Sequence, residues 1–223
     1  TPSKITSIET PSSPLYLLPY STFNVASDTL SLFKEGEKVL EASSSEAFEE
    51  VYALLTTALS EGKTVQVKTA SGLFVLGRIE KSKLLPSMKN VEVLPTDLSV
   101  VERMVVIREN EIKALATFER PSIRCKVNAM FAQKEILPTS RVLVRLADEW
   151  LVYHVCKRLF AQGVSFLFKA PATLLKADVC VVTSLTLPAI EPLQVSVLEN
   201  GEIILVKGKS YASKTLLENT KKF

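Results

Sequence analysis

The sequence predicts a mixed α/β (α+β) protein, in which helices flank a twisted β-sheet of mixed strand direction. Segments with the apolar spacing of helices alternate with short segments rich in branched apolar residues, which is the pattern of interleaved helices and strands. Near the C-terminus, two strand-like segments flank Asn200-Gly201, a dipeptide typical of a tight antiparallel hairpin. Helical crossovers and a hairpin within one sheet require strands that run in both directions.

A helix is expected over about residues 48–59. Ser43-Ser-Ser-Glu46 precedes it and matches a capping box, in which Ser and Glu side chains satisfy backbone amides of the first turn. Apolar residues then recur with helical spacing as far as Gly62. Glycine is the residue that most readily takes the left-handed conformation found at helix ends.

The other elements follow by the same criteria. Three further helices are predicted: 97–104, with Asp97 as its cap; 109–118, which stops before Pro121; and 147–161, which ends at Gly163. Strands are predicted at residues 64–68, 73–76, 123–127, 142–146, 164–168, 177–183, 194–198 and 203–207. The strands on either side of helix 147–161 predict a β-α-β unit.

The composition favours one main core. Of 223 residues, 47% are hydrophobic and 23% are charged, so the chain can bury enough apolar surface to offset its conformational entropy. No apolar run approaches the roughly 20 residues that cross a bilayer, and no signal peptide is recognisable. We therefore expect a soluble, cytoplasmic protein without membrane insertion. The formal charge of +3 is too small by itself to indicate nucleic-acid binding.

Metal-site and triad chemistry are not expected. Cys125, Cys156 and Cys180 are odd in number and lie in apolar surroundings, which predicts reduced thiols in the core. With one histidine and no Cys-x-x-Cys, the chain does not supply the about four ligands that zinc requires. His154 and Arg158, one helical turn apart, could hold a phosphate or carboxylate. A histidine on a helix flank beside a solvated arginine is the simpler interpretation.

Lysines near strand ends are the candidates for anion binding. Lys68 ends a predicted strand and precedes Thr-Ala-Ser71-Gly72, small residues that would expose its ammonium group to a ligand. Lys207 and Lys209 form a basic cluster after the C-terminal hairpin. For both groups the alternative is an ordinary solvent-exposed lysine. The chain has neither the dinucleotide-binding nor the P-loop glycine motif.

Taken in order, several segments resemble the YrdC-type domain of HypF, the carbamoyltransferase family of [NiFe]-hydrogenase maturation. The family pattern Leu-x-x-Gly-Lys-Ile-Val-Ala-Ile-Lys-Gly-Leu-Gly-Gly resembles Leu59-Ser-Glu-Gly-Lys-Thr-Val-Gln-Val-Lys68-Thr-Ala-Ser-Gly72, where two glycines are replaced. The family's Lys-Pro-Leu-Ala-Val-Met strand resembles Lys89-Asn-Val-Glu-Val-Leu94, and its Asp-Leu-Glu helix resembles Asp97-Leu-Ser. Its Glu-x-x-Leu-Leu…Arg-Pro-Ile segment resembles Glu111-Ile-Lys-Ala-Leu-Ala-Thr-Phe-Glu-Arg120-Pro-Ser-Ile, and its closing hairpin resembles Leu205-Val-Lys-Gly-Lys-Ser-Tyr211.

The resemblance covers about residues 20–215 and implies a YrdC-like fold. It divides the chain into a flexible leader, a small appendage, a YrdC-like domain and a tail: 1–13, 14–43, 44–215 and 216–223. The appendage resembles the HypF zinc-finger region without its cysteines, because Phe23-Asn-Val-Ala26-Ser-Asp stands where the fingers would lie. No zinc is expected there.

In the family, this domain makes a carbamoyl-adenylate from carbamoyl phosphate and ATP, with lysines, arginines and backbone donors stabilising phosphate charge. The family's Ser-Gly-Asn loop corresponds to Phe168-Lys169-Ala-Pro171, and its Asp-Asp-Ser-Val-x-Arg strand to Pro192-Leu-Gln194-Val-Ser-Val197. Its segment with Lys-Arg-Arg-Pro is reduced to about Glu80–Met88. Loss of one such donor commonly costs about 10²- to 10³-fold in rate, so these replacements predict a catalytically degenerate domain.

The resemblance implies an accessory or assembly role in hydrogenase maturation, with hydrogenase or hydrogenase-maturation proteins as partners. One alternative is an active carbamoyl-adenylate synthase that uses ATP, and another is an RNA-binding protein, since YrdC-type domains outside HypF act in tRNA modification. No catalytic residue and no cofactor is assigned, although ATP is a ligand to test, at weak affinity. The candidate ligand- and anion-binding residues are Lys68, Ser71, Gly72, Lys89, Lys169, Lys207 and Lys209. We expect Lys68 and the 207–209 strand end to open on one concave face.

Overall fold

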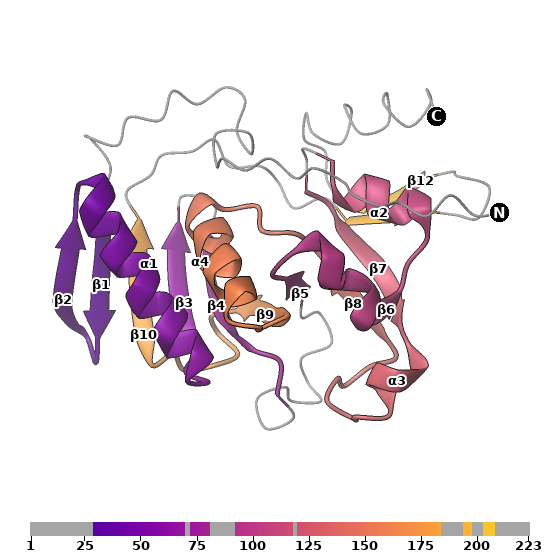
Figure 1. Ribbon diagram of the computed structural model, residues 1–223, viewed down its shortest axis with the longest axis horizontal. Coiled ribbons are helices and arrows are strands. Elements are labelled where there is room, and N and C mark those ends of the chain that lie inside the picture. Colours follow the sequence, from indigo (N-terminus) through magenta and orange to yellow (C-terminus); the bar gives the residue numbers. More distant parts are fainter. Residues whose placement is uncertain are drawn as a thin grey trace.

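One twisted β-sheet extends along the long axis of the computed structural model, with helices packed against it (Figure 1). The structure describes residues 29–69, 72–80, 92–117, 120–183, 194–197 and 203–207. Within these residues the sheet has 12 strands in the order β12-β11-β7-β8-β5-β9-β4-β3-β10-β1-β2, and β6 pairs with β7 beside this path. Both parallel and antiparallel pairs occur, so the predicted mixed sheet flanked by helices is confirmed.

Strands and helices are interleaved along the chain. The strands are β1 (Leu30–Lys34), β2 (Glu37–Ala42), β3 (Val65–Thr69), β4 (Gly72–Arg78), β5 (Glu92–Pro95), β6 (Val105–Val106), β7 (Ser122–Val127), β8 (Arg141–Val144), β9 (Phe166–Pro171), β10 (Val179–Thr183), β11 (Gln194–Val197) and β12 (Ile203–Lys207). The helices are α1 (Ser45–Ser60), the 3-10 helix η3 (Leu98–Arg103), α2 (Glu109–Leu115), α3 (Ala129–Ala132) and α4 (Trp150–Ala161). The sequence patterns did not predict β1, β2, β6 and α3.

Side-chain caps are present at α1 and η3, but at α1 the N-cap is Ser44 and not Ser43, the first residue of the predicted capping box. Ser44, the second serine of the predicted box, accepts a hydrogen bond from the Ala47 amide at 3.3 Å. Gly62, just beyond the C-cap, has a φ of 80°, which a residue with a side chain rarely adopts. Asp97 accepts a hydrogen bond from the Ser99 amide at 2.9 Å and so caps η3 as expected.

The β1–β2 hairpin belongs to the same sheet as the rest of the chain. Its turn, Glu35-Gly36, has positive φ at both residues, which matches the twist of a two-residue hairpin. β1 pairs antiparallel with β10, so that Leu30 lies opposite Thr183. Residues 30–42 of the predicted appendage therefore pair with the predicted YrdC-like domain, and the division of the chain at residue 43 stays a prediction.

The predicted β-α-β unit is wrong in its strand direction. β8 pairs parallel with β5, whereas β9 pairs antiparallel with β5, so β8 and β9 run in opposite directions with β5 between them. Residues 145–149 join β8 to α4, and residues 162–165 join α4 to β9. The prediction failed because the order of elements along the chain does not show that β5, from an earlier part of the sequence, lies between β8 and β9 in the sheet.

Side chains pack on both faces of the sheet. α1 and α4 lie on the same face (Figure 1). There, residues such as Tyr52, Leu59 and Leu159 form a core with the apolar side chains of β1, β3, β4, β9 and β10. On the opposite face Val75, Phe168 and Ala170 form a smaller cluster.

Near β7 and β8, a further cluster joins η3, β6 and α2 to the sheet. Among the described helices, none is long and apolar enough to cross a membrane.

Candidate anion-binding site

Lys68 projects from the sheet face opposite α1. Val65 and Val67 on the same strand, β3, are buried in the core that contains α1. Successive side chains of a strand point to opposite faces, and Lys68 is therefore directed away from α1, where it is exposed. Lys68 is opposite Leu73 of β4 and Val182 of β10.

Lys169 projects from the other face. Its neighbours on β9, Phe168 and Ala170, belong to the cluster on the face away from α1. The Lys169 ammonium group lies 4.4 Å from the centre of the Phe74 ring, and Phe74 is part of the core beneath α1 and α4. The described chain thus does not bring Lys68 and Lys169 into one pocket.

The other predicted site residues are placed only in part. Lys207 ends β12 at one edge of the sheet, and β11, β7, β8, β5, β9 and β4 lie between β12 and the strand of Lys68. Gly72 begins β4, where its backbone is opposite Thr69. Ser71, Lys89 and Lys209 lie outside the described residues, as do the segments 23–28 and 81–88. The shared concave face stays a prediction.

Lys169 takes part in an ion-pair cluster at the start of α4. Its Nζ lies 3.4 Å from Asp148 Oδ1, and Arg145 Nη2 lies 2.9 Å from Asp148 Oδ2. Burial alone would raise the pKa of Asp148, but attraction to Lys169 and Arg145 outweighs it and holds this pKa below its usual value. Asp148 is therefore ionised at neutral pH and offsets the charge of the two cations.

Arg120, which directly precedes Pro121 and β7, is a further buried cation. Its side chain is buried and its φ is 46°. Burial lowers the pKa of Arg120, while Tyr153 and Asp148 act in the opposite direction, which indicates that both groups lie near the guanidinium. The sequence patterns did not single out Arg145 or Asp148. A signal was present, because a charged residue directly after a buried strand such as β8 must find a partner.

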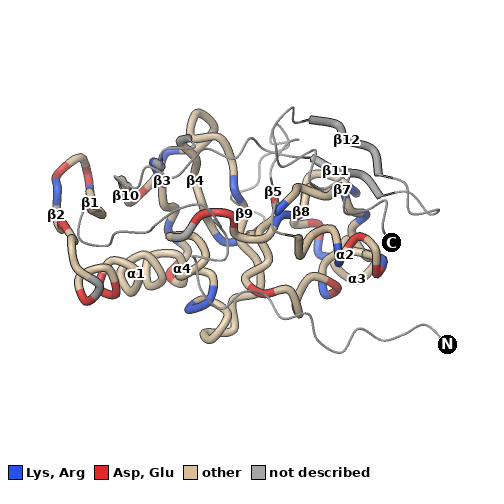
Figure 2. Tube along the Cα trace, turned by 90° about the horizontal axis from the view of Figure 1, so that it is seen from above, with Lys and Arg blue, Asp and Glu red and all other residues tan. Residues whose placement is uncertain are grey.

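Further basic side chains lie on the same sheet face as Lys169, on the strands beyond α4. Arg124, Leu143, Glu92 and Lys169 are successive register partners on β7, β8, β5 and β9. Lys126 is opposite Arg141, and Arg124, Lys126 and Arg141 are exposed. We call these three residues the basic strip; Figure 2 shows basic positions along β7 and β8. The carboxylate of Glu92 accepts a hydrogen bond from the Ser122 hydroxyl.

His154 and Arg158 join α4 to α1. The His154 ring stacks on Tyr52 with 4.9 Å between ring centres and an angle of 5°. Arg158 lies 4.8 Å from the centre of the same Tyr52 ring and forms an ion pair with Glu49. Burial is the main cause of the lowered pKa of His154, and the positive charge of Arg158 is the second. The predicted helix-flank histidine is thus present, but the expectation of a solvated arginine is wrong, because Tyr52 and Glu49 hold Arg158 against α1.

The prediction of cysteines in the core is confirmed for Cys125 and Cys156, but it is wrong for Cys180, which is only partly buried. Cys125 and Cys156 are buried, and burial raises the pKa of each to about 12. The thiol of Cys180 is partly exposed and accepts a hydrogen bond from the side-chain Nε2 of Gln66 at 3.7 Å. In the described part of the chain, no group of three or more His, Cys, Asp or Glu side chains could hold a metal ion.

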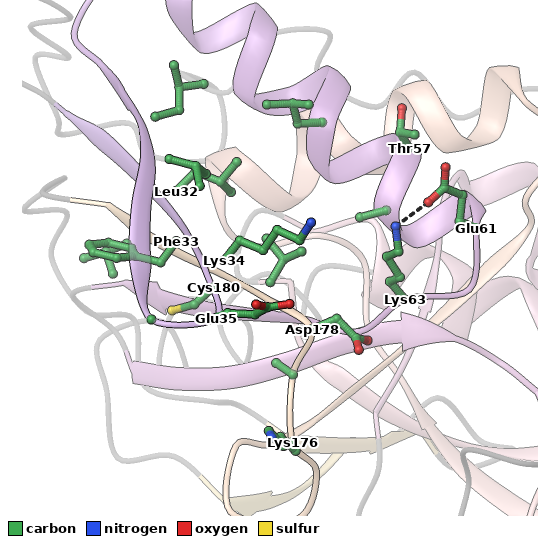
Figure 3. Close-up of a pocket in the computed structure, with 18 of the residues that line it drawn as sticks. Leu32, Phe33, Lys34, Glu35, Thr57, Glu61, Lys63, Lys176, Asp178 and Cys180 are labelled. Atoms are coloured by element: carbon green, nitrogen blue, oxygen red, sulfur yellow. Dashed lines mark hydrogen bonds and ion pairs between the residues drawn. The ribbon is translucent and has the colours of Figure 1, made fainter.

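A large open pocket lies away from the ion-pair cluster of Lys169, Asp148 and Arg145. It has a volume of about 1350 Å³ and is lined by the β1–β2 hairpin, α1 and residues 176–180 (Figure 3). Lys63 at its wall is paired with Glu61 at 2.6 Å. The lining contains none of the predicted site residues, so this pocket is distinct from the predicted anion site.

No protein-family model and no curated protein sequence matches the chain. Solved structures do match it. T. kodakarensis HypF aligns with a TM-score of 0.58 and 12% identity, covering 81% of this chain and 26% of that one. Full-length HypF in the phosphate- and nucleotide-bound form aligns with a TM-score of 0.56 and 17% identity, again over 81% of this chain and 26% of that one. E. coli YciO aligns with a TM-score of 0.52 and 11% identity, covering 71% of this chain and 89% of YciO.

The chain therefore spans 26% of the length of the two HypF proteins. At these levels of identity the likeness concerns the fold. The predicted resemblance is confirmed at that level: the chain has a HypF-like, YrdC-type fold.

Proposed function

We propose that the chain is a catalytically degenerate, HypF-like module that acts in the cytoplasm as an accessory or assembly protein in [NiFe]-hydrogenase maturation. Its partners would be hydrogenase or hydrogenase-maturation proteins. The likeness of fold to HypF supports the pathway. The main evidence for a loss of catalysis is that strand β9 continues through Lys169.

The backbone at this position is committed to the sheet. β9 continues through Lys169 to Pro171, where the resemblance expects a Ser-Gly-Asn loop that binds nucleotide and carbamate-like groups. Lys169 has register partners on both sides, Leu76 and Glu92. Backbone groups of a strand with two neighbours are used in the sheet hydrogen bonds, and Pro171 has no amide hydrogen. Few backbone donors are left for a phosphate.

The side chain of Lys169 is also engaged. Asp148 offsets its charge and the Phe74 ring covers it. What remains for a nucleotide are exposed cations such as Lys68. Each such charge pair contributes about 1 kcal/mol or less in water. Together with the entropy lost on binding, this corresponds to ATP affinity near the millimolar range.

An ATP–pyrophosphate exchange assay with carbamoyl phosphate tests the loss of catalysis. We expect no exchange above background, with an active HypF protein as the positive control. Exchange that needs carbamoyl phosphate would establish the alternative, an active carbamoyl-adenylate synthase. Deletion of the gene in its source organism tests the pathway, because hydrogenase activity should fall and return when the wild-type chain is supplied.

The basic strip supports a second candidate, RNA binding. Arg124, Lys126 and Arg141 are exposed on adjacent strands and could follow a phosphate backbone. Binding of unmodified tRNA should weaken steeply with salt and lose affinity in Arg124→Gln. Lys38→Gln on β2 is the matched control. Salt-independent binding, or equal loss in both variants, would rule this candidate out.

A further inference from the structure

The pocket beside the β1–β2 hairpin is a groove with apolar walls. Its apolar lining comes from the hairpin, from α1 and from the start of β10: Leu32, Val39, Leu40, Leu54, Ala58 and Val179. Among these residues, Val39 is 54% exposed and Leu54 is 44% exposed. Contiguous apolar surface that stays exposed commonly marks a binding surface. An occupant of this groove is therefore expected.

The size of the groove suits a peptide segment better than a small molecule. Its volume of about 1350 Å³ exceeds the about 300 to 1,000 Å³ of typical small-ligand pockets. Along α1 the lining extends from Glu50 to Glu61, which corresponds to about 16 Å of helix. Figure 3 shows Thr57 and Glu61 on this helix and Lys34 at the end of β1. This length accommodates about five residues of extended chain.

The charged groups at the groove do not select a charged occupant. Lys63 pairs with Glu61 at 2.6 Å, and Asp178 accepts hydrogen bonds from the Thr64 amide at 2.7 Å and from the Thr64 hydroxyl at 2.9 Å. The other charged residues of the lining together carry no net charge: Lys34, Glu35, Glu50 and Lys176. A charged side chain placed against the apolar walls would lose hydration without gaining an excess counter-charge. The groove therefore fits an uncharged peptide.

We propose that residues 15–20 of this chain, Leu-Tyr-Leu-Leu-Pro-Tyr, dock in the groove as an extended segment. They lie outside the described residues. Residues 10–27 around them form the longest stretch of the sequence without a charged side chain. Pro14 and Pro19 disfavour a helix through this segment. An extended, apolar and uncharged segment matches both the length and the lining of the groove.

The position of the segment in the sequence favours docking within one molecule. β1 begins at Leu30, and its last residue, Lys34, lines the groove. The strand is 5 residues long, or about 17 Å, whereas residues 21–29 can span about 30 Å when extended, so the segment can reach the groove. A short tether gives an effective concentration on the order of millimolar, which populates even weak docking. This inference goes beyond the proposed function, since it requires neither a hydrogenase partner nor a nucleotide.

Photo-crosslinking of the purified chain tests the proposal. With p-benzoylphenylalanine in place of Tyr16, irradiation should produce cross-links within single molecules, and mass spectrometry should map them to lining residues of α1 and the hairpin. Leu54→Asp should lower the yield at least about tenfold, because docking would bury its carboxylate without a partner. Leu174→Asp is the matched control, since Leu174 is 41% exposed and does not line the groove.

Circular dichroism shows whether the variants fold. Leu17→Asp changes the segment instead of the groove and should cause the same loss, which decides the question if Leu54→Asp does not fold. Cross-links that join two chains would overturn the proposal and identify the groove as a contact between copies. Cross-links that map elsewhere, the absence of cross-links, or equal yields in Leu54→Asp and Leu174→Asp would overturn it as well.

Discussion

Lys169 Nζ and Asp148 Oδ1 lie 3.4 Å apart and connect β9 to the segment that leads into α4. The contact carries two consequences. It offsets a cation that the resemblance placed in a ligand-binding loop, and it holds the carboxylate that also pairs with Arg145. The same pair therefore bears on the stability of the fold and on the anion chemistry of this face.

Asp148→Asn should lower the free energy of unfolding at pH 7 by about 3 to 5 kcal/mol, because it leaves the buried Arg145 without its counter-charge. The pKa of Asp148 is lower in the folded chain than in the unfolded chain. Its stabilisation is thus fully present above the unfolded pKa of about 3.9 and is lost as the pH falls through the folded pKa.

Urea unfolding from pH 7 down to pH 2 measures this effect. The difference between wild type and Asp148→Asn should shrink at the acidic end. Glu102→Gln, at an exposed position, is the control and should change stability by no more than about 0.5 kcal/mol. A difference between wild type and Asp148→Asn that stays constant over the whole pH range would contradict the assigned charge interaction.

Gly77→Ala should destabilise the centre of the sheet. A Cβ at this position would lie 2.6 Å from two atoms of the buried Phe168 ring, which is closer than real contacts allow. Overpacking of this kind typically costs about 1 to 3 kcal/mol. Phe168→Leu should cost stability alone but less in the Gly77→Ala background, so a double-mutant cycle by urea unfolding should give a favourable coupling energy. Strict additivity would show that the ring is not the obstacle.

Local signals in the sequence predicted most of the fold. Ser44, Asp97 and Gly62 act at helix ends through neighbouring backbone groups, so the sequence around them was sufficient. β2 was missed because its side chains are mostly exposed and lack a clear apolar alternation. The direction of β9 was also missed, since the path of residues 145–149 depends on tertiary packing.

The candidate site was less accessible to sequence reasoning. Lys169 was identified through the resemblance, but its partner Asp148, which also pairs with Arg145, precedes it by a whole helix and meets it only after β9 and α4 have packed. Sequence order likewise could not show that Lys68 and Lys169 project from opposite faces. That relation depends on which apolar neighbours face α1, and β9 carries apolar residues on both sides.

The pKa of His154 should lie below 6.5 and rise in Arg158→Met. Burial is the main cause of the lowered pKa and the nearby Arg158 charge is the next. The chain has one histidine, so its NMR signals are unambiguous during a pH titration. Lys157→Met is the control and should cause a smaller rise, because Lys157 contributes least to the shift. An Arg158→Met variant with an unchanged histidine pKa would refute the proposed arrangement of the two side chains.

Cys180 should be the first cysteine to react with iodoacetamide in the native chain at pH 8. Burial raises the pKa of Cys125 and Cys156 to about 12, so almost no thiolate is present at either position, and both sulfurs are covered. Burial also raises the pKa of Cys180, although the Gln66 side-chain amide and Lys68 act in the opposite direction, and its thiol is partly accessible.

Mass spectrometry after brief labelling should find one slow modification at Cys180, and none in Cys180→Ser. Lys68→Met should slow the reaction by removing a cation that favours the thiolate, whereas Lys34→Met serves as the matched lysine control. Rapid labelling of Cys125 or Cys156 in folded protein would mean that the cores around β7 and α4 open far more readily than their burial implies.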